Sequence, residues 1–283
     1  PADYFSARRS QAHLPLVLML VLTQMSVGAF VVEQLMAWFS SGNEGMSHAV
    51  RAVHLIAALG LGMLGMFAAV FHLGRPFYAY RSVLGLKSSW LSREIVAFGL
   101  FAALATAYTA SAFGNYVGFA VSPHVQAVLG IAAALTGVLG VACSIMIYVV
   151  TQRVFWSGSF STIKFFGTAV VLGIPTSLLI SLLAATHSDA LTIKGFMAAY
   201  GRSLCGWLLL GTTAKLLFEA TIFWHLSNKL HTPLKRTALL LAGELGITTI
   251  QRFFLAVVGG LFLPAVLLLE STLAPGKGFH PLF

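Results

Sequence analysis

Two side chains that exchange protons flank one polar loop in an otherwise apolar chain. His72 closes one apolar stretch and Glu94 opens the next, with a basic, serine-bearing loop between them. If both stretches are membrane helices, the imidazole and the carboxylate lie at the same membrane face. An imidazole with an ordinary pKa of about 6.5 accepts a proton near neutral pH, and a carboxylate can accept another. These are the proton-handling groups that a quinol head-group needs when it is oxidised.

Each of these residues also has a structural interpretation. Gly74 and Pro76 stop the helix after His72, so the imidazole can cap the helix C-terminus and interact with its dipole. Glu94 can initiate the following helix through a Ser-x-x-Glu capping box, or it can pair with Arg93. A carboxylate at the edge of the hydrocarbon region is nevertheless costly, which makes Glu94 a candidate functional group.

The composition places the chain in a membrane. Of its 283 residues, 58% are apolar and 9% are charged, whereas soluble domains carry about a quarter charged residues. The net charge of +9 comes from basic residues in loops between apolar stretches, so membrane topology explains it and no nucleic-acid partner is expected. The two cysteines, Cys143 and Cys205, are too few for an iron–sulfur cluster, which needs about four ligands. No zinc-type spacing of ligands occurs, so no metal site is assigned.

Seven apolar stretches have the length of a spanning helix, about 20 residues. The expected fold is an all-α polytopic transmembrane helix bundle at 14–283, preceded by a separate N-terminal segment at 1–13. The apolar segment 237–250 is too short to span, and it predicts an interfacial or re-entrant helix or the first half of a longer, tilted final span. The seven predicted spans are 14–38, 49–71, 93–113, 125–150, 165–186, 203–225 and 253–269.

The basic residues are distributed unevenly between the two faces of this bundle. Seven spans place the N-terminus and the segments 74–90, 152–164 and 226–252 on one face, which holds most of the Lys and Arg residues. Such an excess marks the cytoplasmic side, so the N-terminus is predicted to be cytoplasmic in an inner membrane. The same face also suits docking of a soluble subunit. Arg75 and Arg81 can bridge to an acidic partner or anchor to lipid phosphates.

Three short sequences carry a resemblance to a known family. HLGRP at 72–76 and SSWLSREI at 88–95 resemble the loop between the second and third helices of the membrane anchor subunit of dimethyl sulfoxide reductase, which belongs to the wider polysulfide-reductase membrane-subunit superfamily. TQMSVGAF at 23–30 extends the likeness into the first span. The resemblance implies an anchor that oxidises menaquinol or ubiquinol in anaerobic electron transport. It also implies two partners, an iron–sulfur subunit and a molybdopterin catalytic subunit.

The resemblance also implies site residues. The histidine that matches His72 is implicated in quinol binding in these anchors, so His72 and Glu94 are predicted to be the catalytic pair. Gln24 and Gly28 match the family pattern TQ-x-x-x-G, although packing between helices explains them equally well. Arg252 resembles an arginine that begins the corresponding family helix, but it can instead pair with Glu244. The predicted cofactor-binding residues are Gln24, Gly28, His72, Arg75, Ser92, Arg93, Glu94 and Arg252.

Charged residues inside the spans leave a transporter as one alternative function. Lys215 and Glu219 are one helical turn apart, so they can form a structural ion pair or relay protons. Glu33 lies near the opposite face and is expected to be a structural or channel-lining acid. The three residues could form a charged path for protons or a solute. Transporters often show internal repeats, however, and the chain has no clear one.

A haem b cytochrome is the other alternative. Bis-histidine ligation needs two imidazoles at matching depth on neighbouring helices, and His72 and His225 leave such a pair open. The other candidate histidines lie at or near helix ends, and no Cys-x-x-Cys-His motif occurs. With the resemblance, these observations predict a quinol-binding subunit without haem.

The two ends of the sequence predict a longer native polypeptide. The chain begins Pro-Ala-Asp and stops at GFHPLF without a polar tail. Anchors of the family are expected to have eight spans, so an eighth is expected after Phe283. Some relatives resemble fusions of two subunits, and a ferredoxin-like domain is therefore expected before Pro1.

Overall fold

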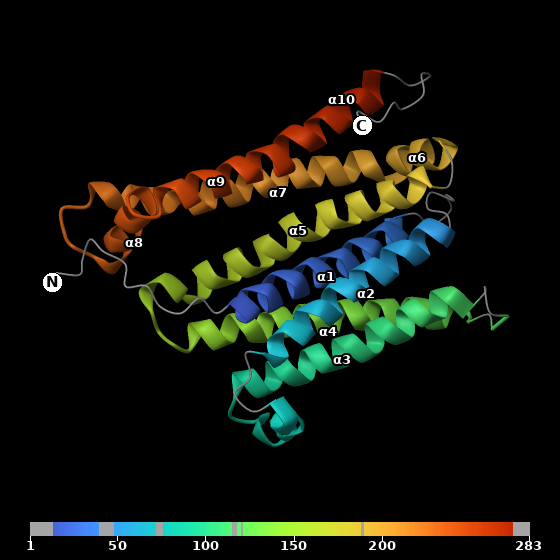
Figure 1. The fold of residues 1–283 in the computed structure, drawn as a ribbon, viewed down its shortest axis with the longest axis horizontal. Coiled ribbons are helices and arrows are strands. Elements are labelled where there is room, and N and C mark those ends of the chain that lie inside the picture. The colour runs from blue at the N-terminus through green and yellow to red at the C-terminus, as the bar shows by residue number, and fades with distance from the viewer. Residues whose placement is uncertain are drawn as a thin grey trace.

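The fold is taken from a computed structural model of the chain, which describes residues 14–39, 48–71, 76–114, 118–119, 121–187 and 190–273. All regular elements in these residues are helical (Figure 1). A helix satisfies its backbone N–H and C=O groups within one segment, which is why long apolar runs fold this way in lipid. The predicted all-α class is confirmed, and six of the described helices are long and apolar enough to cross a membrane.

Five long helices form the main body of the bundle. Successive helices run in opposite directions, so α1, α3 and α5 point one way and α2 and α4 the other (Figure 1). The first helix, α1, packs on α2, α4 and α5, while α3 packs mainly on α4. The five are α1 (Leu14–Phe39), α2 (His48–Val70), α3 (Trp90–Phe113), α4 (Pro123–Val149) and α5 (Gly158–Thr186).

Small residues allow these helices to approach closely. A Cβ atom added to Gly28 on α1 would lie 2.2 Å from the carbonyl oxygen of Ala169 and 2.7 Å from the Cα of Gly173, both on α5. On α4, a Cβ atom at Gly140 would lie 2.7 Å from the ring of Phe98. Close packing of this kind drives helix association in membranes, where apolar side chains gain nothing by leaving the lipid. The packing interpretation of Gly28 is therefore confirmed.

A second helical layer lies beside α5. It begins with a continuous helical run that packs on α5 along much of its length (Figure 1). The run consists of α6 (Ala190–Phe196), a π turn (Met197–Gly201), α7 (Arg202–Ala220) and a 3₁₀ turn (Thr221–Ser227). The charges of Lys215 and Glu219 lower the mean hydropathy of α7, and α7 is not among the six candidate spans. The count of seven spans stays a prediction.

The final helix is longer than expected. It combines α9 (Gly246–Val257), a π turn (Val258–Phe262) and α10 (Leu263–Leu273), and it packs against α7. The predicted span 253–269 therefore begins too late. The segment 237–250 is divided, since its first part lies in the short helix α8 (Pro233–Ala242) and its last part opens α9. The last part of 237–250 thus belongs to a longer final helix, as one of the two expectations has it, and an interfacial or re-entrant position of α8 stays a prediction.

The connections gather at the two ends of the bundle. One end carries the start of α1, the α2–α3 and α4–α5 connections, and α8, and we call it the basic end (Figure 1). The α2–α3 connection contains a 3₁₀ helix, Pro76–Gly85, that projects away from the other helices. The basic end is the face predicted to be cytoplasmic, and its orientation in a membrane stays a prediction.

Candidate functional site

Glu94 is buried between α3 and α4 rather than exposed at a helix end. The helix begins at Trp90 because the hydroxyl of Ser89 caps it, accepting a hydrogen bond from the backbone N–H of Ser92 at 3.2 Å. Glu94 lies one turn further in and is 5% exposed. Its Oε1 accepts a hydrogen bond from Ser144 Oγ on α4. The capping-box interpretation of Glu94 is wrong, because the position three residues after the cap is Ser92.

The surroundings of Glu94 are mainly apolar and aromatic. Cys143 and Tyr148 of α4 lie near its carboxyl group. The ring of Tyr148 packs against Trp156 at 5.1 Å and against Phe165 of α5 at 5.4 Å between centroids. No ion pair joins Glu94 to a described Lys or Arg. A membrane-buried carboxyl group held by a single described hydroxyl is a costly arrangement, and such groups are usually functional.

Arg93 and Ser92 hold the α2–α3 connection against α3 through hydrogen bonds and close packing. Arg93 donates from Nε to the carbonyl oxygen of Leu86 at 2.8 Å and from Nη2 to that of Lys87 at 2.9 Å. Its guanidinium group also stacks on the ring of Trp90, 4.1 Å from the centroid. Gly85, at the end of the 3₁₀ helix, has no side chain to clash with the hydroxyl of Ser92. These contacts hold the loop over the end of α3, and a direct role of either residue in ligand binding stays a prediction.

Gln24 supplies an open hydrogen-bond acceptor in the centre of the bundle. The residue is 5% exposed, and its Oε1 has no hydrogen-bond partner among the described residues. A buried amide oxygen without a donor is rare and calls for an explanation, such as a ligand that donates to it. Val27 on α1 lies against Gly137 of antiparallel α4. Because the two helices are antiparallel, moving three residues back on α1 from Val27 to Gln24 corresponds to moving three residues forward on α4 from Gly137 to Gly140. Gln24 therefore lies at about the depth of Gly140, which is one helical turn from Ser144.

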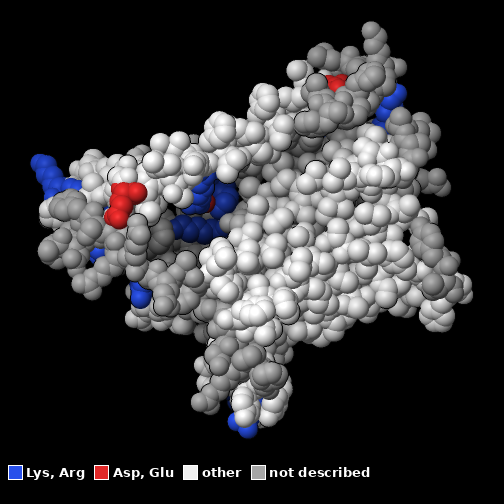
Figure 2. Space-filling view, in the orientation of Figure 1, with Lys and Arg blue, Asp and Glu red and all other residues white. Residues whose placement is uncertain are grey.

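His72 and Arg75 lie outside the described residues, so their predicted roles stay predictions. The described chain reaches Phe71 at the end of α2 and resumes at Pro76. In the projecting 3₁₀ helix, Arg81 is exposed and stacks on the rings of Tyr78 and Tyr80, at 4.8 and 5.9 Å from their centroids. Figure 2 shows basic side chains at the tip of this projection.

Arg252 lies with a different set of charges from Glu94. Its guanidinium group pairs with Glu219 of α7. Glu219 also lies 2.7 Å from Lys215 Nζ, so the predicted Lys215–Glu219 ion pair is confirmed. The helix α5 stands between this set and the α3–α4 pair that buries Glu94 (Figure 1). The structure therefore brings Glu94 and Ser144 together, with Gln24 at a similar depth, and places Arg252 elsewhere.

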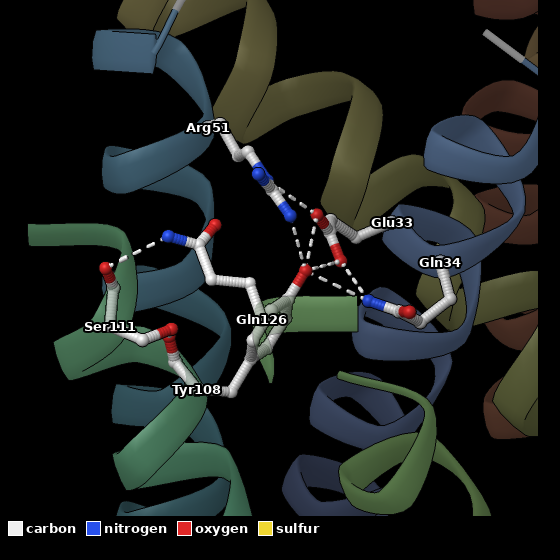
Figure 3. Close-up of polar contacts among 6 residues, drawn as sticks. All are labelled: Glu33, Gln34, Arg51, Tyr108, Ser111 and Gln126. Atoms are coloured by element: carbon white, nitrogen blue, oxygen red, sulfur yellow. Dashed lines mark hydrogen bonds and ion pairs between the residues drawn. The ribbon is translucent and has the colours of Figure 1, made fainter. Parts of the chain in front are cut away.

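A second buried polar cluster joins α1, α2 and α3 (Figure 3). Its residues lie in the later parts of α1 and α3 and in the first turn of α2, which is towards the end opposite the basic end. Arg51 Nε lies 2.8 Å from Glu33 Oε1, and Arg51 Nη2 donates to the Tyr108 hydroxyl at 2.6 Å. That hydroxyl lies within 2.9 Å of both Glu33 oxygens, and Gln34 donates to Glu33 Oε2 at 2.6 Å. These contacts support the structural interpretation of Glu33. The sequence signal that points to Arg51 is its place at the start of the second span, on the same membrane face as Glu33.

The intramembrane charges do not form the continuous path that a transporter would need. Gly28 of α1 lies opposite Gly173 of the parallel helix α5, whereas Lys215 lies beside Gly167. Glu33 is five residues beyond Gly28, so it is level with a point on α5 five residues beyond Gly173, and this point is eleven residues from Gly167. At 1.5 Å per residue, Glu33 and Lys215 are therefore roughly 16 Å apart along the bundle. Glu33 is neutralised by Arg51, and Lys215 by Glu219.

The described histidines are dispersed. His54 of α2 is fully buried, and its Nε2 lies 3.0 Å from Ser177 Oγ of α5. His124 is exposed at the start of α4, and His225 lies in the 3₁₀ turn after α7. Among the described residues, no three His, Cys, Asp or Glu side chains gather in a way that could hold a metal ion.

Comparison with known proteins identifies a family and three relatives. The family model for the DMSO reductase anchor subunit (DmsC) matches residues 9–218. A polypeptide of the anaerobic dimethyl sulfoxide reductase of Haemophilus influenzae is 30% identical over 168 residues, covering 58% of this chain and 57% of the relative. The YnfH polypeptide of an anaerobic dimethyl sulfoxide reductase of Escherichia coli is 30% identical over 164 residues, 56% of this chain and 54% of the relative.

The third relative carries a different name. It is a subunit of the sulfite dehydrogenase of Allochromatium vinosum, 35% identical over 106 residues, which cover 37% of this chain and 32% of the relative. The chain thus matches little more than half the length of the two reductase polypeptides and about a third of the length of the sulfite dehydrogenase subunit. No solved structure shows a significant match.

Proposed function

This chain belongs to the DMSO reductase anchor subunit family, and we propose that it is the quinol-oxidising membrane subunit of a modular oxidoreductase. The family and the apolar helices make it a multi-pass integral membrane protein. In the proposal, menaquinol or ubiquinol is oxidised near the basic end, in the inner membrane and on its cytoplasmic side. The electrons pass to an iron–sulfur subunit or fused domain, and from there to a molybdopterin catalytic subunit.

The observation that carries this proposal is the burial of Glu94 against Ser144 at the basic end. Oxidation of a quinol releases two electrons and two protons, so the site needs a proton acceptor within hydrogen-bond reach of each hydroxyl. Glu94 is the acceptor for one hydroxyl, with Ser144 orienting its carboxyl group. Gln24 is suited to accept a hydrogen bond from the other hydroxyl while the quinol is bound, before that hydroxyl loses its proton. His72 takes the second proton, and both protons leave through the α2–α3 connection.

The position of the site suits electron transfer. The sequence has two cysteines, and both are free and buried in α4 and α7. The electrons therefore need an acceptor in a partner subunit or fused domain, and a quinol at the membrane face lies closer to such an acceptor than one at the midplane. Reduction of quinone by electrons arriving from a partner is the second candidate function. It is favoured by the match to a subunit named for a sulfite dehydrogenase.

The reduction of the partner's iron–sulfur clusters by quinol tests the proposed function directly. We expect added menaquinol to reduce these clusters in the purified complex, as measured by electron paramagnetic resonance. Clusters that stay oxidised, while a soluble donor reduces them, would reject quinol oxidation by this subunit. Quinone reduction by reduced clusters in the same sample would favour the second candidate.

The visible spectrum of the complex supplies a further prediction. We expect the quinol-reduced minus oxidised difference spectrum to lack the sharp Soret and α bands of haem b, because the described histidines are dispersed and the family likeness implies none. Stoichiometric haem b in a pyridine haemochrome assay would contradict this expectation. His225→Ala would then show whether His225 is a ligand.

The exposed cations of the α2–α3 connection are the proposed docking site for the iron–sulfur partner. Arg81 and Lys87 are both exposed. The double variant Arg81→Glu and Lys87→Glu should reduce the partner recovered by affinity purification at least about tenfold, because like-charge contacts across an interface cost several kcal/mol. Lys194→Glu, an exposed change near the other end of the bundle, is the control. Undiminished recovery of the partner at moderate salt would show that this docking face is wrong.

A further inference from the structure

Three cations and one carboxylate line a recess between α5, α7 and α9, which we call the basic recess. Its residues are Lys164, Lys215, Glu219 and Arg252. Figure 2 shows basic side chains gathered in a hollow towards the basic end of the molecule, between the second helical layer and the main body. Lys164 and Arg252 lie in the second turns of α5 and α9, and Lys215 and Glu219 lie in the last two turns of α7, so the recess is at the basic end and away from the middle of these helices.

The basic recess holds more positive charge than it neutralises. Glu219 contacts both Lys215 and Arg252, and it is 8% exposed at its side chain. Lys164 is the third cation, and its Nζ lies 6.0 Å from the centre of the Phe160 ring. That ring packs against Phe218 of α7, the neighbour of Glu219, at 5.3 Å between centroids. The Nζ of Lys164 also lies 3.4 Å from the centre of the Phe155 ring. Three cations and one carboxylate leave a net charge of +2, and uncompensated charge among helices in a membrane is costly unless an anion binds.

An apolar groove of about 810 Å³ lies between α1, α5 and α7, further along the bundle than the recess. Its lining nearest the recess comes from Val170 of α5 and from Gly211 and Ala214 of α7, and Ala214 directly precedes Lys215 in the sequence. The helices α5 and α7 are close together at the level of Lys215, since a Cβ atom on Gly167 of α5 would lie 3.9 Å from Lys215 Cδ. The other lining residues come from α1, α5, the π turn before α7 and α7 itself, and they include Phe39, Tyr200 and Trp207.

The length of this groove matches a lipid tail. Its lining on the α7 side runs from Ala199 to Ala214, which at 1.5 Å per residue is roughly 22 Å. One leaflet of a bilayer contributes about 15 Å of hydrocarbon, half of a core of about 30 Å. A groove of this length accommodates a complete acyl tail that starts at the level of the recess.

We propose that the basic recess and the apolar groove together form a binding site for an anionic phospholipid. The phosphate lies between Lys164 and Arg252, and one acyl tail follows the groove between α5 and α7. Cardiolipin fits best, because its two phosphates match the net charge of +2, and basic pockets between membrane helices on the cytoplasmic side are typical sites for its head-group. A quinol is neutral and would leave the cations uncompensated, whereas an acidic side chain of a partner would leave the groove unfilled.

The lipid retained by the purified complex tests this site. The complex is extracted from membranes in mild detergent, and its phospholipids are quantified by mass spectrometry per anchor polypeptide. Lys164→Gln with Arg252→Gln removes two cations and leaves Glu219 paired with Lys215. Arg153→Gln with Lys229→Gln removes two exposed cations at the same end of the bundle and is the matched control. Ala214→Trp places a large side chain in the groove without changing a charge.

The wild type and the control should each retain about one cardiolipin, and the recess variant should retain about tenfold less, since two charge-assisted contacts are lost. Ala214→Trp should lose the same lipid. Equal retention in all four proteins would overturn the proposal. A quinone that co-purifies with the wild type and disappears in Ala214→Trp, with cardiolipin unchanged, would also overturn it and assign the groove to quinone.

Thermal melting of the delipidated wild-type complex distinguishes a lipid from a free anion, and it does not depend on the folding of any variant. Cardiolipin vesicles should raise the melting temperature, whereas phosphatidylcholine vesicles and inorganic phosphate should not. An equal shift with inorganic phosphate would show a simple anion site and overturn the lipid assignment. The same shift with phosphatidylcholine would overturn it too, because the head-group charge would not be recognised.

Discussion

Glu94→Gln should abolish quinol oxidation while the complex still assembles. The amide keeps the size of the carboxyl group and can still accept a hydrogen bond from Ser144, but it cannot take a proton from the quinol. Loss of a general base typically costs about 10²–10⁴-fold in rate, so we expect quinol turnover to fall at least about 100-fold. The measurement is quinol-dependent reduction of the complex's terminal substrate in membranes. Glu244→Gln, an exposed acid near the same end of the bundle, is the control and should keep full activity.

A soluble electron donor separates a damaged site from a damaged complex. Reduced viologen delivers electrons to the catalytic subunit without quinol, so its activity in Glu94→Gln should be normal. Loss of both activities would indicate misassembly. Near-normal quinol turnover in a correctly assembled Glu94→Gln complex would remove Glu94 from the site.

Gln24 and His72 can be tested in the same assay. Gln24→Leu removes the open acceptor, and because a neutral hydrogen bond contributes about 1 kcal/mol, its effect should appear mainly as a several-fold higher KM for quinol. His72→Arg keeps a positive charge and donors but loses a base that titrates near neutral pH, so it should fail almost as badly as His72→Ala.

Arg51→Leu should destabilise the subunit by about 3 kcal/mol or more, because removing one partner of a buried ion pair typically costs about 3–5 kcal/mol. Glu33 is fully buried, and Arg51 is the cation that pairs with it in the described structure. Tyr108 and Gln34 would remain as donors to Glu33, but neither carries a charge. The measurement is the unfolding of the purified subunit in mixed micelles, followed by circular dichroism.

The double variant Glu33→Gln with Arg51→Leu is the critical comparison. It removes the uncompensated carboxylate, so it should recover much of the stability that Arg51→Leu loses. If the double variant lost as much free energy of unfolding as the two single variants together, the ion pair would not explain the instability of Arg51→Leu. Quinol turnover of the folded Arg51→Leu protein should stay close to normal. Glu33 is nine residues beyond Gln24 on α1, which places the cluster roughly 14 Å further along the bundle than the proposed site.

Membrane class and most helices could be predicted from the sequence, for a physical reason that requires no tertiary contact. An apolar run of about 20 residues in lipid must satisfy its own backbone hydrogen bonds, and only a helix does so within one segment. The first four helices therefore lie close to their predicted ranges. Errors occur where hydropathy is a poor guide to helix ends. The final helix begins at Gly246, before its charged residue Arg252, and α5 begins at Gly158, well before Phe165.

The sequence also determined which residues are chemically unusual. A carboxyl group, an ion pair or a glutamine within an apolar span is expensive, and Glu33, Glu94, Gln24, Lys215 and Glu219 are all recognisable for that reason. For Lys215 and Glu219, the spacing alone was enough to predict an ion pair, because residues four apart on a helix share a face. The sequence resemblance in the α2–α3 connection indicated the family, and the match of the family model to residues 9–218 established it.

Only the tertiary structure decided the partners of these residues on other helices. Glu94 meets Ser144, Glu33 meets Arg51 and Tyr108, and Glu219 meets Arg252. Each pairing depends on how far a helix is rotated and at what depth it crosses its neighbour. In water, the contrast between a polar and an apolar face would reveal that rotation, but in lipid both faces are apolar. Close contacts such as Gly28 against Gly173 set rotation and depth, and a single sequence does not show which small residues meet.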